Sequence, residues 1–476
     1  MAAWRRAVGG AALVAVLAVA GCTGDRDTPA PAAPDSGGFP PGATGIGDSY
    51  FPTYGNGGYD VANYRLKVRY DPATDRLSGT ALITATATGD LSRFDLDLSG
   101  LTVSAVRVDD APAQQRRDGA ELVITPAKGL ANGSRFTVEV VYEGVPKPFE
   151  SPRLGANGFV STTDGAIALG QPESASTWFP VNDHPLDKAS YDYEITVPTG
   201  LAALTNGVPG GTRPAEAGWT TWLWSEKNPM ASYLSTVVIG DYRVKTGTHD
   251  GKPMVTAVAA SLPEGGAADV SVARTGEIVD FLATRFGPYP FGSYGGIVIN
   301  DDRFRFALET QSRPVYGNAF FRGDANTSVV AHELAHQWFG DSVSIARWSD
   351  IWLNEGFASY AEWLWEEHTG GRSVRESFDA QYAATDWSKP AVDPGRENLF
   401  GTAVYKRGAL VVHALRLAVG DDAFFRILKT WTAEKRDGNA TTDDLIAVAE
   451  RVSGTSLRSL FTAWLSGTSA PAIPAR

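Results

Sequence analysis

The chain has 476 residues, of which 43% are hydrophobic and 20% are charged. This composition is typical of a folded protein with two or three domains and excludes wholesale disorder. The formal net charge is −12 and the sequence has no run of Lys or Arg, so a phosphate backbone would be repelled and nucleic acid is not expected as a partner. Cys22 is the single cysteine, so packing rather than an internal disulfide must hold the fold together.

The first 22 residues have the pattern of an export signal. Arg5 and Arg6 precede an apolar stretch, residues 7–20, that is too short to span a bilayer stably. Small residues then lead to Cys22, and this ending resembles a bacterial lipobox, in which the cysteine is lipidated. We therefore expect a lipoprotein signal peptide over residues 1–22 and a protein anchored through Cys22 at the outer face of the cell membrane. The alternative is a plain secretory signal with an incidental cysteine.

The rest of the chain divides by its pattern into three parts. Residues 23–47 are rich in Pro, Gly and Ala and lack apolar periodicity, which predicts a flexible linker. Polar and apolar residues alternate over 64–70 and 135–142, as in half-buried strands, and Asn-Gly and Asp-Pro turn signals punctuate this region. Helical spacing replaces this pattern later, over 273–286, 326–340, 349–368 and 404–419. The sequence therefore predicts an α+β multidomain fold with a β-rich domain over 48–245 and a mostly α domain over 246–476.

A metal-binding pattern lies in the second of these helical stretches. His332 and His336 are four residues apart, so both imidazoles lie on one helix face and can reach one metal ion. Glu333 lies beside the first histidine, where it can take a proton from a water molecule at the metal. Neutral imidazole nitrogens suit Zn²⁺, and two histidines with one carboxylate leave a fourth position for water or substrate.

The third ligand is predicted to be Glu355, nineteen residues after His336 on the next helix. A helix, a turn and an antiparallel second helix return the chain to the metal at about this separation. Asp350, just before that helix, is a candidate either to hydrogen-bond a ligand histidine or to interact with the helix N-terminus.

These segments resemble the gluzincin aminopeptidases of the aminopeptidase N type, peptidase family M1. The resemblance is carried by residues 332–340 (HELAHQWFG) and 352–358 (WLNEGFA), and it extends upstream to 171–185 and downstream to 404–410. It implies an N-terminal β-saddle domain, a thermolysin-like catalytic domain with one Zn²⁺ per chain, and peptide substrates with a free N-terminus. It also implies a short form without the family's C-terminal helical domain, and hence a more open cleft.

The resemblance assigns further roles by position. Tyr405 would donate a hydrogen bond to the oxyanion that forms on the scissile carbonyl. Glu309 and Glu173 would bind the substrate ammonium group, and Ala307 lies in the segment that contacts the peptide main chain. Together with the metal ligands and Glu333, these residues predict a zinc aminopeptidase.

Five positions depart from the family pattern. Phe306 stands where the family has Gly, Thr310 where it has Asn, and Asp341 where Asn commonly follows Gly340, while Lys406 and Arg407 replace Glu-Lys. None of these changes removes a metal ligand or the base. Phe306, however, places a ring where the family's main chain approaches the substrate closely.

Two other functions remain open from the sequence. The same zinc chemistry serves internal peptide bonds, so a zinc endopeptidase of broader specificity is the nearest alternative. A surface protein that retains the fold for binding without catalysis is the alternative from another class.

Overall fold

The computed structural model describes residues 37–151 and 155–475. The predicted signal peptide, Cys22 and most of the predicted linker lie outside the described residues. Within the described part of the chain, no helix combines the length and the apolar character that crossing a membrane requires.

The first half of the described chain is built from strands, as predicted. Its largest sheet has one buried face, because residues along β1, β8 and β12 alternate between buried and more exposed positions. The strands pair antiparallel except that β1 runs parallel to β12. The order in this sheet is β14 (Val208–Pro214), β15 (Trp219–Ala231), β12 (Lys188–Pro198), β1 (Tyr59–Asp71), β2 (Arg76–Ala87), β8 (Arg135–Gly144), β4 (Thr102–Val108) and β5 (Ala111–Pro112).

Two smaller sheets complete this β-rich domain. One has three strands, in the order β3 (Phe94–Asp97), β7 (Glu121–Thr125) and β6 (Gln114–Asp118). The other has five strands, in the order β13 (Ala202–Thr205), β16 (Val237–Gly240), β11 (Ala166–Leu169), β10 (Gly155–Ser161) and β9 (Phe149–Ser151).

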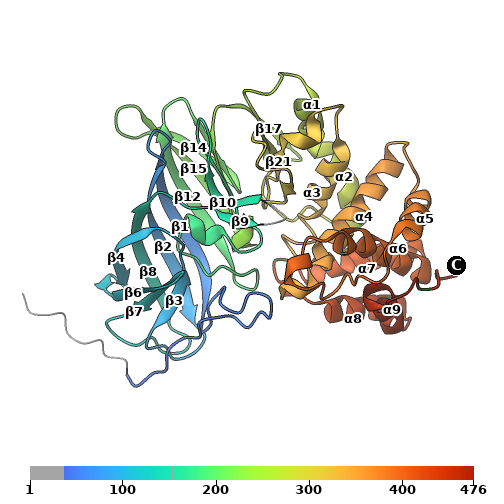
Figure 1. The fold of residues 1–476 in the computed structure, drawn as a ribbon, viewed down its shortest axis with the longest axis horizontal. Coiled ribbons are helices and arrows are strands. Elements are labelled where there is room, and N and C mark those ends of the chain that lie inside the picture. Colours follow the sequence, from blue (N-terminus) through green and yellow to red (C-terminus); the bar gives the residue numbers. More distant parts are fainter. Residues whose placement is uncertain (1–36, 152–154, 476) are drawn as a thin grey trace, which may run out of the picture. The chain divides into compact units, whose positions relative to one another are not determined.

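The second half combines a mixed sheet with helices, and Figure 1 shows these helices as a region separate from the large sheet. The sheet order is β17 (Tyr242–His249), β18 (Lys252–Ala259), β19 (Tyr294–Ile299), β21 (Val315–Gly317) and β20 (Ala307–Leu308), so β20 is an edge strand. A short ladder pairs β22 (Ser344–Ile345) with β23 (Asn439–Ala440). The helices are α1 (Ala267–Ala273), α2 (Thr275–Phe286), α3 (Thr327–Ala335), α4 (Trp352–His368), α5 (Val374–Ala384), α6 (Gly408–Val419), α7 (Asp421–Glu434), α8 (Thr442–Ser453) and α9 (Arg458–Ser466).

This order confirms the predicted fold class, a β-rich domain followed by a mostly α domain, while two details differ from the sequence prediction. The sheet of the second half begins with β17 at Tyr242, a few residues before the expected boundary at 245/246, and the sequence pattern did not reveal its strands. Residues 40–43, which were predicted to belong to the flexible linker, pair with the β-rich domain: the Gly42 amide donates to the Arg93 carbonyl at 2.8 Å. The packed chain therefore begins before residue 48.

A buried carboxylate ties this N-terminal segment to the helical domain. Asp48 is 5% exposed, and its Oδ2 accepts a 2.8 Å hydrogen bond from the Trp348 amide and lies 3.2 Å from His184 Nε2. Burial alone would raise the pKa of Asp48, but the hydrogen bonds from His184 and Trp348 outweigh it and lower that pKa. This contact holds the turn that leads into α4.

Candidate metal centre and active site

Helix α3 carries both histidines of the predicted metal site. Asn326 caps its N-terminus, since the Asn326 side chain accepts a hydrogen bond from the Val329 amide. The helix ends at Ala335 rather than continuing to residue 340, because the chain turns there and the Asp341 amide donates to the His336 carbonyl at 3.0 Å. His336 thus lies at the C-terminal end of α3, one turn beyond His332 and on the same face.

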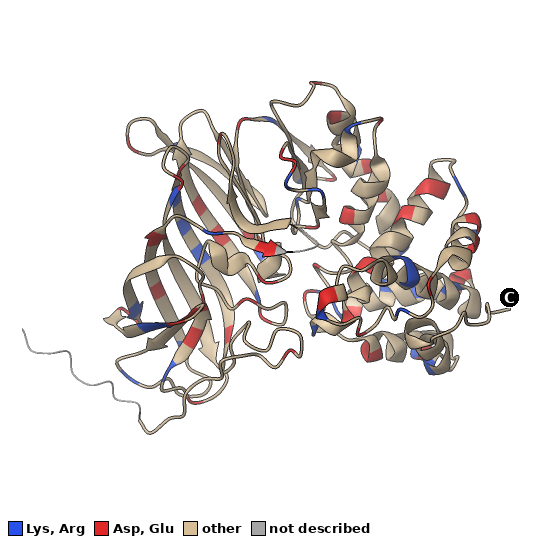
Figure 2. Ribbon diagram, in the orientation of Figure 1, with Lys and Arg blue, Asp and Glu red and all other residues tan. Residues whose placement is uncertain are grey.

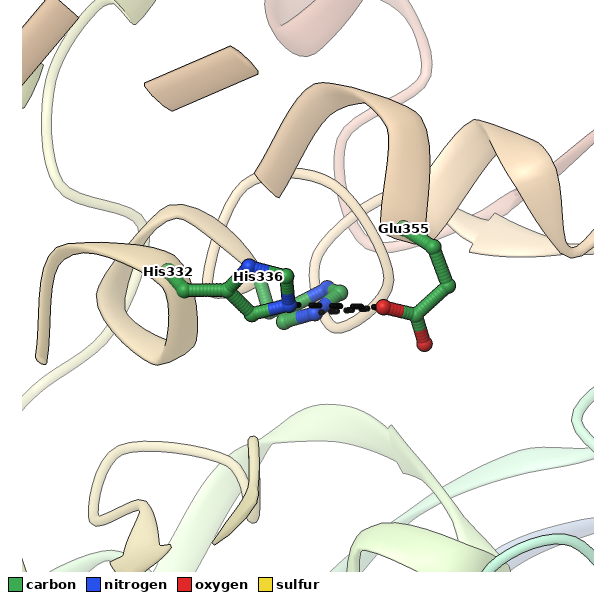
Figure 3. Close-up of side chains that lie close together, drawn as sticks. All are labelled: His332, His336 and Glu355. Atoms are coloured by element: carbon green, nitrogen blue, oxygen red, sulfur yellow. Dashed lines mark ion pairs between the residues drawn. The ribbon is translucent and has the colours of Figure 1, made fainter. Parts of the chain in front are cut away.

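Helix α4 supplies the third side chain from its first turn. Glu355 Oε2 lies 3.4 Å from His332 Nε2 and 3.4 Å from His336 Nε2. Figure 3 shows both imidazole rings directed at one oxygen of Glu355. The structure therefore brings together the three residues that the sequence predicted as metal ligands.

The spacing of these donor atoms fits a tetrahedral metal ion. Ligand atoms about 2.1 Å from a tetrahedral zinc ion lie about 3.4 Å from one another, and the set of two imidazoles and one carboxylate is one that zinc accepts. A second set of donors, Glu309, Glu333 and His336, also lies within ligand distance. The first set fits better, because it places the cation between both histidines and Glu355, whereas the second would leave Glu355 outside the coordination sphere.

The outer nitrogens of both histidines are held by hydrogen bonds. His332 Nδ1 lies 2.6 Å from Glu362 Oε1, and His336 Nδ1 lies 3.0 Å from the Phe339 carbonyl oxygen. A carboxylate and a carbonyl only accept, so Nδ1 carries the proton in each ring and Nε2 keeps a lone pair for the metal. Asp350 does not hydrogen-bond either of these histidines. It accepts a hydrogen bond from Thr442 and forms an ion pair with Arg347.

Burial gives the site unusual electrostatics. Glu309, Glu333 and Glu355 are each at most 5% exposed. Burial raises the pKa of Glu333 to about 8, although His332 and His336 act in the opposite direction. For Glu355 the burial effect is outweighed by His336 and His332, which lower its pKa to about 2. A dication bound between these groups would favour the charged form of each carboxylate.

Glu309 lies at the end of edge strand β20, surrounded by neutral donors. Its Oε1 accepts hydrogen bonds from Gln171 Nε2 at 3.1 Å and from the Tyr233 hydroxyl at 3.0 Å. Burial raises the pKa of Glu309, and no Lys or Arg among the described residues forms an ion pair with it. A cationic ligand group would offset the free-energy cost of burying this carboxylate.

Glu173, the second predicted ammonium-binding residue, does not line the cleft that contains Glu309. Its Oε1 is 3.8 Å from Arg396 Nη2, and its buried Oε2 has no hydrogen-bond partner among the described residues. Burial raises the pKa of Glu173 to about 8, with Asp183 adding to the effect. Within the described chain the cleft next to Glu309 is lined by Gln171, two residues earlier, and not by Glu173.

Tyr405 reaches the metal site from a single π-helical turn, Ala403–Arg407, that precedes α6. Its ring is stacked over His332 with centroids 6.1 Å apart. Burial and the nearby Glu355 raise the pKa of Tyr405 well above its usual value, so its hydroxyl stays protonated and able to donate. Single π turns inside helices frequently occur at functional sites.

Two glycines allow the elements that carry Glu355 and Tyr405 to touch. A Cβ on Gly408 would lie 2.8 Å from the Gly356 Cα, and a Cβ on Gly356 would lie 2.8 Å from the Gly408 carbonyl carbon. Arg407, next to Gly408, is fully buried and donates to the main-chain carbonyls of Trp387, Lys389, Trp464 and Gly467. These contacts fix the π turn against α4.

A cleft of about 350 Å³ contains this arrangement. It holds the three metal-ligand candidates together with Glu333, Tyr405, Glu309 and Ala307, so all sequence-predicted site residues except Glu173 meet in one cavity. The described residues that line it are Gln171, Arg305, Phe306, Ala307, Glu309, Phe320, Asn326, Ser328, Val329, His332, Glu333, His336, Glu355, Glu362 and Tyr405.

Two protein-family models cover most of the chain. The "Peptidase M1 N-terminal domain" matches residues 61–234, and the "Peptidase family M1 domain" matches residues 271–464. The chain belongs to peptidase family M1.

Solved and curated M1 proteins resemble the chain over different shares of their length. The M1 zinc metallopeptidase from Deinococcus radiodurans is 30% identical with a TM-score of 0.82, over 90% of this chain and 98% of that one. A mutant of that enzyme bound to the substrate Tyr-Ser-Ala gives a TM-score of 0.83 at 29% identity, over 90% of this chain and 99% of that chain. Aminopeptidase M1-B of Oryza sativa subsp. japonica is 26% identical over 87% of this chain and 50% of its own length. The chain thus spans about a third to a half of the length of the curated relatives it matches.

Two residues of the M1 site were not singled out from the sequence. Glu362 lies seven residues after Glu355, two helical turns away on the same face of α4, so its spacing offered a usable signal. Gln171 lies within the segment that carries the family resemblance, but no local pattern marks it as a hydrogen-bond partner of Glu309.

The contact between Glu362 and His332 gives a first prediction. Glu362→Gln should weaken zinc binding about 10- to 100-fold, because the amide holds the His332 ring less firmly and reduces its basicity. Competition with a chromogenic chelator measures this affinity. Glu366→Gln, on the same helix but bonded to the Arg372 amide, is the matched control, and equal affinities of the two variants would contradict the prediction.

Asp341 gives a second prediction, on pH-dependent stability. Both of its carboxyl oxygens are buried without hydrogen-bond partners among the described residues, and burial raises its pKa well above the usual value. The folded state then favours the protonated acid, so the stability that this residue contributes is present at acid pH and is lost as pH rises.

Asp341→Asn should therefore stabilise the zinc-loaded protein by about 1–3 kcal/mol at pH 8 and by less at pH 5. Denaturant unfolding at both pH values measures the difference, with exposed Asp324→Asn as control. A gain that is larger at pH 5 than at pH 8 would show that the carboxyl is ionised and satisfied in the fold.

Proposed function

We propose that the protein is a zinc aminopeptidase that removes N-terminal residues from peptides. The observation that carries this proposal is the position of a buried Glu309, without an ion-pair partner in the described chain, in the same cleft as His332, His336 and Glu355. A mutant of the M1 zinc metallopeptidase of Deinococcus radiodurans, an enzyme that matches the chain along nearly its whole length, has been observed with a peptide substrate. A mutant of a two-domain M1 zinc metallopeptidase has been observed with L-arginine. Both complexes support the proposal.

The protein residues have separate tasks in this reaction. His332, His336 and Glu355 would hold the zinc ion, which supplies a Lewis acid that polarises the scissile carbonyl and lowers the pKa of water. A Glu333 carboxylate oxygen takes a proton from the attacking water and then delivers it to the leaving amine nitrogen. The Tyr405 hydroxyl donates a hydrogen bond to the carbonyl oxygen as negative charge develops there.

Glu309 explains why the N-terminal residue would be the one removed. A substrate ammonium group is a compact cation that pairs with a carboxylate, and its burial beside Glu309 offsets the cost of holding that carboxylate away from water. Gln171 and the Tyr233 hydroxyl position the Glu309 carboxylate for this contact. A blocked or internal nitrogen carries no charge and leaves Glu309 unpaired.

The two alternatives differ from this proposal in measurable ways. A zinc endopeptidase would use the same metal and Glu333 but would gain nothing from Glu309. A non-catalytic binding protein would need neither Glu333 nor Tyr405 near the metal, whereas both line the cleft.

Replacing the proposed base separates catalysis from binding. Glu333→Gln should lower kcat by a factor of about 10²–10⁴, because the amide cannot accept the proton, while the three metal ligands remain. Hydrolysis of aminoacyl fluorogenic amides measures the rate, and metal analysis should find one zinc ion per chain in both proteins. Activity that survives the substitution would overturn the assignment of Glu333.

Replacing Glu309 distinguishes the exopeptidase hypothesis from the endopeptidase hypothesis. Glu309→Gln should lower kcat/KM for a substrate with a free N-terminus by about 10²-fold, since a charge-assisted contact made in a buried site is lost. Hydrolysis of the N-acetylated form of the same peptide should change little. The same small change on both substrates would instead support the endopeptidase.

We also propose that the protein is exported and anchored by a lipid on Cys22. The basic head at Arg5 and Arg6, the apolar stretch and the small residues before Cys22 support this proposal. Cys22→Ser should abolish incorporation of radiolabelled fatty acid and release the protein from the membrane fraction. Unchanged labelling of the variant would contradict the assignment.

A further inference from the structure

Arg305 stands out by its charge among the side chains of the cleft. Four of the lining residues are glutamates, Glu309, Glu333, Glu355 and Glu362, whereas Arg305 is the one Lys or Arg among the described residues that line it. Arg305 is exposed, and its Nε donates a 3.3 Å hydrogen bond to the Asp302 carbonyl. No Asp or Glu of the described chain lies within 4.0 Å of its guanidinium nitrogens.

Two nearby arginines, one in the same loop and one after β21, are already paired. Arg303 forms an ion pair with Asp301, and Arg322 contacts Asp302. Arg303 also lines a different cavity. Among these three arginines, Arg305 is therefore the one that lines the cleft without a carboxylate partner in the described chain.

Arg305 and Glu309 lie at opposite ends of edge strand β20. The strand, Ala307–Leu308, pairs with β21 on one side only, and Ala307 lines the cleft. Glu309 is the fourth residue after Arg305, so their Cα atoms are at most about 13 Å apart. A cationic group bound at Glu309 and an anionic group bound at Arg305 would therefore lie at the two ends of one extended ligand.

We propose that Arg305 forms a carboxylate subsite that binds the free C-terminus of short peptides, of about three residues. The inference rests on the proposed aminopeptidase function, because Glu309 must hold the ammonium group of the same peptide. An extended tripeptide spans about 10 Å between its terminal nitrogen and its carboxyl carbon, which is compatible with the separation of the two charged residues along β20. The planar guanidinium has several free donors for a bidentate contact with a carboxylate.

This subsite gives selectivity for length and charge. In a longer peptide the C-terminal carboxylate lies beyond Arg305, so the contact is lost unless an acidic side chain takes its place. An exposed ion pair contributes modestly and is screened by salt, so the expected preference is severalfold and falls as ionic strength rises.

The test compares peptides that differ only at the C-terminus. The zinc-loaded, full-length enzyme should hydrolyse Leu-Gly-Gly with a kcat/KM about fourfold above that of its C-terminal amide, mainly through a lower KM, because the contact exists before and during the reaction. In Arg305→Gln this ratio should fall to about one, and in Arg305→Glu it should fall below one. Arg303→Gln is the matched control and should keep the ratio at about fourfold.

Three results would overturn the proposal in distinguishable ways. Equal rates on the acid and the amide, or a fourfold ratio that persists in Arg305→Gln, would remove the subsite and leave the aminopeptidase function intact. A preference for the acid that is as large with a heptapeptide as with the tripeptide would show that Arg305 does not select peptides by their length. Absence of hydrolysis of every free-N-terminal peptide by the zinc-loaded enzyme would remove the proposed function and the subsite together.

Discussion

One carboxylate oxygen lies 3.4 Å from each of two imidazole nitrogens, and this close approach constrains the whole catalytic half of the chain. Helix α3 must end where its second histidine still faces the first, and α4 must begin within one turn of Glu355. The Glu362 and Phe339 contacts fix the two rings, and the Gly356–Gly408 approach brings the Tyr405 turn against the same helix. Asp48 adds a link from the β-rich domain to the turn before α4. A shift in any of these elements would separate the donor atoms.

Charge is the second organising feature of the site. Three glutamates with little exposure lie close together, and carboxylates buried without partners are costly. Two cations would relieve this cost: a metal ion between Glu355 and the histidines, and a substrate ammonium group beside Glu309. Elsewhere, Lys and Arg are interspersed with Asp and Glu over both domains (Figure 2), in a chain whose formal net charge is −12. Arg305, on the other side of β20 from Glu309, adds one positive charge to the lining of the cleft.

Much of this organisation could be predicted from the sequence because it depends on local periodicity and short motifs. The four-residue spacing of His332 and His336 places them on one helix face, and nineteen further residues suffice for a turn and a returning helix. Strand alternation likewise identified β1 and β8. Where the sequence failed, long-range contacts decide the outcome. The pairing of residues 40–43 depends on Arg93 and Gly57. In the mixed sheet of the second half, β19 and most of β18 are buried, so they carry no distinctive alternation. The positions of Gln171 and Glu173 relative to Glu309 depend on contacts between residues more than a hundred positions apart, which no local pattern encodes.

Crystals of the zinc-loaded protein, with diffraction data on both sides of the zinc absorption edge, would test most directly whether His332, His336 and Glu355 hold the metal. Coordination by these three residues predicts a single anomalous peak in the catalytic domain, with His332 Nε2, His336 Nε2 and a Glu355 oxygen each about 2.0–2.2 Å from its centre. A peak bounded by Glu309 and Glu333 instead, or imidazole nitrogens directed away from the ion, would contradict this assignment.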